Sequence, residues 1–279
     1  MYLELNGQIL NLTPENGFNI RDFNLGFPVV RTVMDGRPNI DGMDDRTRFF
    51  GSRVVSLDID LVGDKWALLD ELAPYLNPAN RPFLVYEDAE QTRRILLRAS
   101  EETAVITAPT NIQRVLLQWV APDGAAEGLD VVEFEVPAVV GVEAGFTWDL
   151  TFNLTFPTTS PSGRINVESP GNVRTYPVIR LFGPCTNPRI DNASDPNLVG
   201  EPKQLRFFQT LSASQFIEVN TRERTVFLNG NPDLPLYSAL DFNVSDYWSL
   251  AAGDNFVKYF PESFGTGARA VILFRPAFL

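Results

Sequence analysis

Residues 216–231 read FIEVNTRERTVFLNGN, and this stretch decides the fold of the second half of the chain. Two β-rich runs, residues 216–219 and 225–228, flank a polar segment, residues 220–223, that is short enough for a hairpin loop. Asn229-Gly230 supplies a second turn, because both residues tolerate a positive φ. The stretch therefore predicts the centre of an antiparallel sheet.

The rest of the second half continues this pattern. From residue 131 onward, runs rich in Val, Phe and Thr alternate with Pro, Gly and Asn turns, and no helical period separates them. Many short strands joined by such turns are typical of a β-sandwich. We therefore predict an all-β second half.

The first half mixes strands with one helix. Residues 53–61 alternate as a half-buried strand, which should bury one face formed by Val55, Leu57, Ile59 and Leu61. Asp64 is a suitable N-cap for a helix over residues 64–76. Pro74 should end or kink this helix, and Asn77-Pro78 closes the segment. We expect its apolar stripe to comprise Trp66, Leu69, Leu72, Ala73 and Leu76.

The chain length of 279 residues suits two domains better than one. Residues 121–128, APDGAAEG, are poor in large apolar side chains and are interpreted as a linker. The predicted architecture is mainly β, with an α+β domain over residues 1–122 and a β-sandwich domain over residues 123–279.

Composition excludes several classes of function. The sequence holds no histidine, so histidine-based nucleophilic catalysis and histidine zinc sites are excluded. Phosphate-binding glycine motifs are absent, so no cofactor, no metal and no enzymatic activity are expected. The single cysteine, Cys185, cannot form an intrachain disulfide. No signal peptide and no apolar run of membrane-spanning length is visible, so we expect a soluble protein made in the cytoplasm.

The formal charge of −12 also limits the partners. A surface of this sign repels phosphate backbones, which argues against specific nucleic-acid binding.

One acidic stretch, residues 35–45, is a candidate site. Counted as a calcium loop it fails, because Arg37 occupies the third position and Ile40 the sixth. We interpret it instead as a loop that is solvated, contacts another subunit, or faces a lumen. The candidate interface or lumen residues are Asp35, Asp41, Asp44, Asp45, Arg46 and Arg48.

The aromatic residues suggest an alternative function. Trp119, Trp148 and Trp248, with Tyr237, Tyr247 and Tyr259, could form a sugar-stacking platform. Such residues in a β-sandwich are more often core, and we predict that Trp248 is core. The alternative, a carbohydrate-binding module for attachment to the host cell wall, stays open.

The order of several segments resembles a known family. Residues 171–183 (GNVRTYPVIRLFG) look like the strand that opens the C-terminal domain of siphophage distal tail proteins. Residues 216–226 resemble their hairpin, residues 248–255 (WSLAAGDN) their closing Trp, Leu, Gly and Asn pattern, and residues 269–275 their final strand. With Trp119 to Asp123 ending the first domain, the form is similar to actinobacteriophage minor tail proteins.

The resemblance implies a structural virion protein. It implies that residues 1–122 form a ring-making domain and that residues 123–279 form a galectin-like domain. It further implies a hexameric ring at the tail tip that joins the tail tube protein to hub, baseplate or fibre proteins and lets DNA pass without specific binding. The histidine that galectins place in their sugar site is missing here, so that binding pattern does not carry over.

Overall fold

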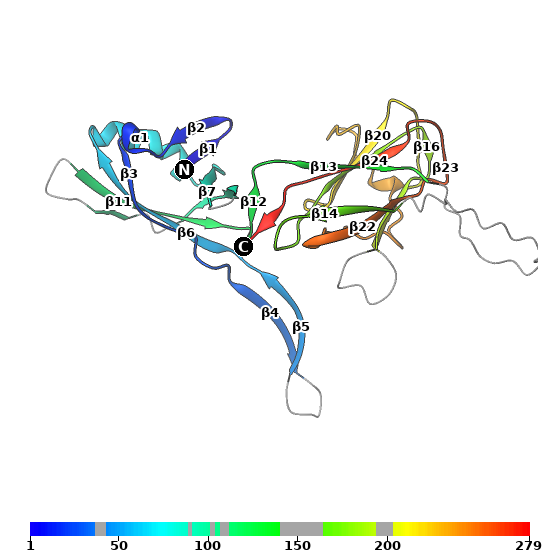
Figure 1. Ribbon diagram of the computed structural model, residues 1–279, viewed down its shortest axis with the longest axis horizontal. Helices are drawn as coiled ribbons and strands as arrows, with labels where there is room; N and C mark the ends of the chain where they lie inside the picture. The colour runs from blue at the N-terminus through cyan, green and yellow to red at the C-terminus, as the bar shows by residue number, and fades with distance from the viewer. Residues whose placement is uncertain (37–42, 89–90, 101–103, 107–111, 140–163, 194–202) are drawn as a thin grey trace, which may run out of the picture. The chain divides into compact units, whose positions relative to one another are not determined.

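The computed structural model describes residues 1–36, 43–88, 91–100, 104–106, 112–139, 164–193 and 203–279 (Figure 1). These residues form two compact units, one comprising residues 1–129 with 277–279, the other residues 130–276. The described part is mainly β with a single α-helix, which confirms the predicted fold class. The boundary predicted between residues 122 and 123 stays a prediction.

The first unit contains a six-stranded antiparallel sheet of order β2-β1-β7-β8-β12-β25. Its strands are β1 (Tyr2–Leu5), β2 (Gln8–Asn11), β7 (Phe83–Glu87), β8 (Thr92–Leu96), β12 (Ala126–Gly128) and β25 (Ala277–Phe278). A 3-10 turn, η1 (Pro14–Asn16), follows β2. The interpretation of residues 121–128 as a linker is wrong for β12, because its backbone pairs with both β8 and β25.

A second sheet of order β10-β11-β6-β3 faces the first across the core. Its strands are β3 (Phe18–Asn24), β6 (Arg53–Val62), β10 (Ala104–Ile106) and β11 (Ile112–Ala121), and β9 (Arg98–Ala99) also pairs with β11. The alternation predicted for β6 is confirmed, since Val55, Leu57, Ile59 and Leu61 are all fully buried. Together with Leu3, Leu84 and Ile95 from the other sheet they form one hydrophobic cluster.

The predicted helix is α1 (Lys65–Leu76), and Asp64 caps it by accepting hydrogen bonds from the backbone N–H groups of Trp66 and Ala67. The predicted apolar stripe is partly wrong. The buried residues are Leu68, Leu72 and Tyr75, whereas Trp66 is 68% exposed. Residues spaced by four and three positions share a helix face, and the core of this unit selects the face of Leu68 rather than that of Trp66.

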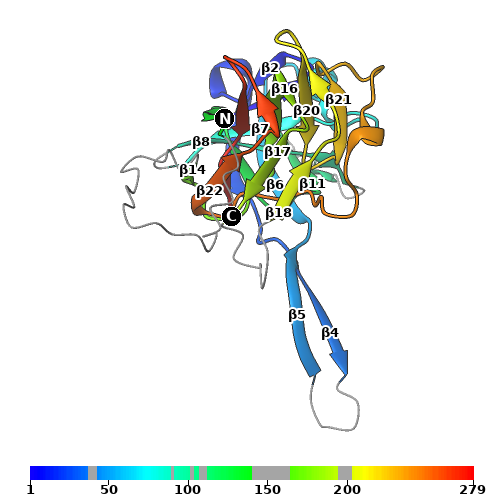
Figure 2. The same cartoon turned by 90° about the vertical axis from the view of Figure 1, so that its right-hand side faces the viewer.

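The strands β4 (Val30–Gly36) and β5 (Met43–Phe50) form a two-stranded antiparallel sheet of their own. This hairpin extends from the body of the first unit in both ribbon views (Figures 1 and 2). At its connection with the body, the backbone N–H of Val29 donates a hydrogen bond to the carbonyl of Ser52, and the N–H of Gly51 donates one to the carbonyl of Val29.

The second unit is a β-sandwich with two main sheets, β13-β24-β15-β20-β21 and β14-β22-β17-β18, and a small sheet, β19-β16-β23. The first sheet comprises β13 (Val132–Pro137), β15 (Val178–Phe182), β20 (Phe216–Asn220), β21 (Thr225–Leu228) and β24 (Arg269–Phe274). The second comprises β14 (Arg164–Ser169), β17 (Arg189–Asn192), β18 (Lys203–Arg206) and β22 (Gly253–Tyr259). The small sheet comprises β16 (Cys185–Thr186), β19 (Thr210–Leu211) and β23 (Ser263–Phe264), and a 3-10 turn, η2 (Tyr237–Ala239), precedes β22.

The hairpin predicted from residues 216–231 is confirmed as β20 and β21. The side-chain oxygen of Asn220 accepts hydrogen bonds from the backbone N–H groups of Arg222 and Glu223, which fixes the polar loop. Arg224 completes the turn in the left-handed region, with φ at 56°. Ile217 and Val219 point into the core between the two main sheets, so the hairpin is central to the sandwich.

Among the described residues, no helix has the length and apolar character needed to cross a lipid bilayer.

Candidate functional site

Part of the acidic segment predicted as a loop belongs to the strands of the β4–β5 hairpin, namely residues 35–36 and 43–45. Asp35 lies in β4 opposite Asp44 of β5, and Asp45 lies opposite Met34. The loop interpretation is therefore wrong for these positions, because ladder hydrogen bonds satisfy the backbone of a polar strand as well as that of an apolar one.

The remaining candidates of this segment follow along β5. Arg48 lies opposite Thr32, and Arg46 lies where the register shifts between Thr32 and Met34. Asp41 falls outside the described residues. The structure thus brings Asp35, Asp44 and Asp45 together at the far part of the hairpin, while Arg48 lies nearer its base. Their use in an interface or a lumen stays a proposal.

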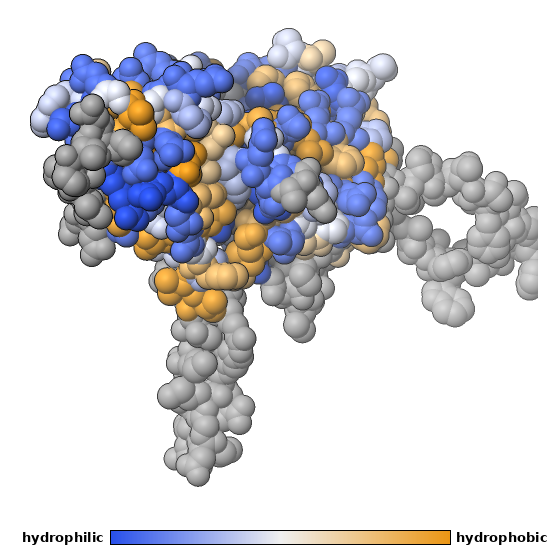
Figure 3. Space-filling view, turned by 60° about the vertical axis from the view of Figure 1, so that its left-hand side comes forward, coloured by the Kyte–Doolittle hydropathy of each residue, from blue (hydrophilic) through white to orange (hydrophobic). Residues whose placement is uncertain are grey.

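Large apolar side chains are exposed where the hairpin joins the body. This base patch comprises Phe27, Val29, Val30, Phe50 and Val54, each more than half exposed, and Phe27 is 93% exposed. The space-filling view shows hydrophobic residues gathered beside the hairpin (Figure 3). Contiguous exposed apolar surface of this kind marks interaction sites in soluble proteins.

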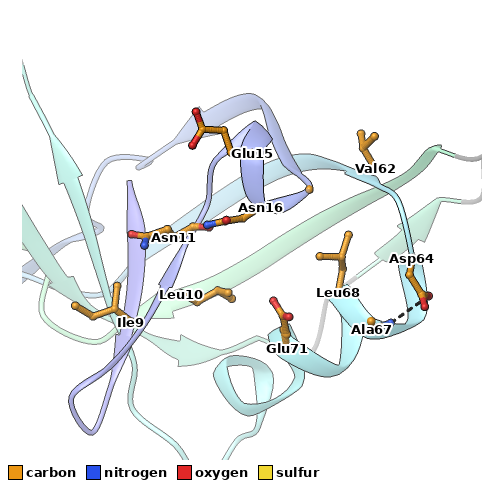
Figure 4. Close-up of a pocket in the computed structure, with 11 residues that line it drawn as sticks. Ile9, Leu10, Asn11, Glu15, Asn16, Val62, Asp64, Ala67, Leu68 and Glu71 are labelled. Atoms are coloured by element: carbon orange, nitrogen blue, oxygen red, sulfur yellow. Dashed lines mark hydrogen bonds between the residues drawn. The ribbon is translucent and has the colours of Figure 1, made fainter.

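A groove lies between β2 and α1, with a volume of about 570 Å³. In Figure 4, Ile9, Leu10 and Asn11 line one side, and Asp64, Ala67, Leu68 and Glu71 line the other. Glu15, Asn16, Gly17 and Val62 complete the lining. Three carboxylates and no cationic side chain line this groove, which favours a positively charged partner group.

The groove also exposes a sheet edge, because β2 is the outermost strand of its sheet. The backbone N–H of Leu12 donates a hydrogen bond to the carbonyl of Met1, the residue before β1. Because hydrogen-bonded pairs alternate in an antiparallel ladder, Leu10 and Gln8 also bond to β1. The backbone groups of Ile9 and Asn11 therefore point outward, away from the sheet. An outward-facing edge of this kind can pair with a strand of another chain. The sequence alone did not reveal this groove, since no local pattern records which strand of a sheet is outermost.

The aromatic platform is not formed. Trp119, Trp248 and Tyr259 are fully buried, which confirms the prediction that Trp248 is core. Tyr237 is exposed and Tyr247 is partly buried. Trp148 falls outside the described residues. The carbohydrate-binding alternative is therefore not favoured.

The described residues offer no metal or nucleophilic centre. Within them, no three Asp, Glu or Cys side chains are grouped so that they could hold a metal ion. Cys185 is buried, and its thiol lies 3.3 Å from the hydroxyl of Tyr259. Burial raises the pKa of Cys185, so the thiol stays protonated and inert. The surfaces described above are suited to binding rather than to chemistry.

Comparison with known proteins identifies the kind of molecule that carries these surfaces. Residues 170–277 match the family model described as "Siphovirus-type tail component, C-terminal domain". This match covers less than half of the chain and makes the second unit similar to a siphophage tail component domain. The prediction made from the order of residues 171–183, 216–226, 248–255 and 269–275 is thereby confirmed. A comparison with curated proteins gives no match.

Solved structures share the fold over the whole chain. The Dit protein of phage SPP1, described as a paradigm of the hub adsorption apparatus in phages that infect Gram-positive bacteria, matches with a TM-score of 0.68 and 15% identity, covering 100% of this chain and 99% of that one. A chain of the phage P2 baseplate in its activated conformation also matches, with a TM-score of 0.50 in the structure with calcium and 0.51 in the structure with strontium. Each match has 12% identity and covers 98% of this chain and 97% of the other. At these identities the likeness establishes the fold.

Proposed function

We propose that this distal tail protein forms a closed ring, six copies in number, at the tip of a siphophage tail. The ring joins the tail tube protein to hub, baseplate or fibre proteins, and it serves as an architectural part rather than as an enzyme. The observation that carries this proposal is the fold match over the full length of both chains with a hub protein, together with the family match of the second unit.

The surfaces of the first unit support self-assembly. The base patch leaves Phe27 almost entirely in water in the isolated chain, and burial of such an aromatic side chain against a neighbour stabilises an interface. The outward edge of β2 is a second surface that a neighbouring molecule can cover, which protects it from unspecific strand pairing. A ring supplies such cover to every copy equally.

The charge of the chain supports a role as a conduit. A formal charge of −12 in each copy produces a strongly negative potential around a ring. DNA that passes through such a ring is repelled by its wall and does not adhere. We propose that the acidic positions of the β4–β5 hairpin, Asp35, Asp44 and Asp45, contribute to this wall or to contacts between subunits.

Mass photometry of the purified protein tests the proposal. A hexamer of the 31.2-kDa chain has a mass of about 187 kDa, and a ring is visible by negative-stain electron microscopy. We expect this species in purified protein or on isolated tails. A chain that stays monomeric at all concentrations and is also absent as a ring from assembled tails contradicts the proposal.

A further inference from the structure

Three polar side chains of the first unit, Arg53, Tyr86 and Arg93, each hold at least one buried polar atom without a hydrogen-bond partner. Arg53 begins the buried face of β6, and Tyr86 of β7 lies opposite Arg93 of β8 in the facing sheet. Tyr86 contacts the ring of Phe23 in β3, with centroids 5.4 Å apart, so it faces the second sheet. The cluster therefore lies between the two sheets.

Arg53 is the most unusual member of this cluster. It is only 3% exposed, and neither its Nε nor its Nη2 has a hydrogen-bond partner. Within the described residues it forms no ion pair. Burial lowers the pKa of Arg53, and the neighbouring Arg93 lowers it further. A buried guanidinium without a counter-charge is strongly unfavourable, so a native structure rarely retains one without a bound anion or an acidic partner.

The neighbours of Arg53 add further donors. The hydroxyl of Tyr86 lies beside the guanidinium of Arg93, and neither this hydroxyl nor the Nε of Arg93 forms a hydrogen bond of regular geometry. Arg93 holds Asp88 through Nη1 at 2.9 Å and stacks its guanidinium over the ring of Phe278 at 4.3 Å, which fixes its orientation. The Arg93 side chain is partly exposed, so the cluster adjoins solvent on that side.

We propose that Arg53, Tyr86 and Arg93 form a binding site for a small oxyanion of the phosphate or carboxylate type. The two guanidinium groups can only donate hydrogen bonds, and the phenolic hydroxyl can donate one as well. Oxyanions are the ligands that such a group of donors recognises. The anion neutralises the buried charge of Arg53 and joins β6 of one sheet to β7 and β8 of the other. Its source is either a free anion or a carboxylate of a second copy of the chain.

The first test is a titration of the 279-residue protein with sodium phosphate at constant ionic strength, measured by isothermal titration calorimetry. Arg53→Met removes the buried donors, and Arg81→Met is the matched control because Arg81 is exposed. We expect one phosphate per chain for the unmodified protein and for R81M, and at least tenfold weaker binding for R53M. Tyr86→Phe removes one donor and keeps both guanidinium groups, so it should weaken binding several-fold even if R53M does not fold.

Thermal unfolding separates a specific site from a general salt effect. Phosphate stabilises most proteins slightly, so the difference between variants is the relevant quantity. The melting temperature should rise by at least ~3 °C more in phosphate than in chloride for the unmodified protein and R81M, and by less for Y86F.

The second source has its own signature. If a carboxylate of a second copy occupies the site, R53M loses self-association while R81M keeps it, and phosphate dissociates the unmodified assembly by competition. The proposal would be overturned if the unmodified protein, R53M and Y86F bind phosphate equally and also self-associate equally. That result would leave the proposed ring intact, since the base patch can form it without Arg53.

Discussion

The indole N–H of Trp119 donates a hydrogen bond to the backbone carbonyl of Tyr75 at 3.2 Å, inside the core of the first unit. Tyr75 lies in the last turn of α1, where carbonyl groups have no partner within the helix. Trp119 belongs to β11, so this one bond caps the helix from the sheet beneath it. The position of α1 thus depends on a residue that follows it by more than forty positions.

Replacing Trp119 by Phe removes this bond and keeps a large aromatic ring in the core. The buried carbonyl of Tyr75 then lacks its donor, and we expect the free energy of unfolding to fall by about 1–3 kcal/mol. Urea denaturation measures the change. Trp66→Phe, at the exposed indole of the same unit, is the control and should cost less than ~0.5 kcal/mol. Equal stabilities of the two variants would show that Trp119 acts only through its volume.

In the second unit, the hydroxyl of Thr221 donates to the backbone carbonyl of Pro177 at 2.8 Å and is buried. This bond joins the turn after β20 to the residue that precedes β15. Thr221→Val keeps the shape of the side chain and removes the donor, so we expect a loss of about 1 kcal/mol. The exposed Thr210 offers a matched control as T210V. Chemical denaturation that finds no difference between these variants would count against a stabilising role for the hydroxyl.

Asp58 should make the first unit sensitive to acid. The Nε and Nη2 of Arg114 donate hydrogen bonds to the two carboxylate oxygens of Asp58. These bonds lower the pKa of Asp58 below its usual value of about 3.9. A carboxyl with a lowered folded pKa contributes stability that is present above the unfolded pKa and is lost as the pH falls through the folded pKa. The stability advantage of the unmodified protein over D58N is therefore expected at neutral pH. It should begin to shrink as the pH falls to the unfolded pKa of about 3.9 and should vanish only below the lowered folded pKa of Asp58.

Melting curves between pH 7 and pH 2 measure this difference. Asp70→Asn serves as the control, because Asp70 is exposed on α1. A constant gap between the unmodified protein and D58N across this range would contradict the assignment.

Phe27 should matter for assembly and not for folding. Because it is 93% exposed in the isolated chain, Phe27→Ser should leave the melting temperature of the monomer unchanged. In the ring, loss of a buried aromatic contact should shift the midpoint of assembly to at least tenfold higher protein concentration. Mass photometry over a dilution series reports this midpoint. Phe242→Ser, at an exposed phenylalanine of the second unit, is the comparison, and identical midpoints for both variants would exclude the base patch from the interface.

The acidic positions of the β4–β5 hairpin are tested by replacing Asp41, Asp44 and Asp45 together with Asn. If these carboxylates face a lumen, rings form normally and DNA ejection is slower, because repulsion of phosphate is weaker. If they pair with Arg46 or Arg48 across a subunit boundary, rings are lost instead. Electron microscopy and an ejection assay distinguish the two outcomes. Unchanged rings and unchanged ejection would mean that the acids are only solvated.

The sequence by itself determined the mainly β fold class, the single helix of the described residues and the resemblance of the second half to a tail component. Alternation in β6 and the hairpin of residues 216–231 depend on contacts between near neighbours, and these leave a periodic record in the chain. The order of four such segments was enough to predict the resemblance to a siphophage tail component, which the family match over residues 170–277 bears out. The absence of histidine was equally visible, since composition needs no coordinates.

Only the tertiary structure decided which faces those elements bury and which they leave exposed. Trp66 and Leu68 both fit a helical stripe, and the packing of α1 on the first unit buries Leu68 and exposes Trp66. The polar residues 44–48 lie in a strand because β4 lies beside them and satisfies their backbone hydrogen bonds. Arg53 reads as an ordinary strand residue, and only the opposite sheet turns it into a buried cation. Burial and pairing arise from segments far apart in the chain, so local pattern cannot specify them.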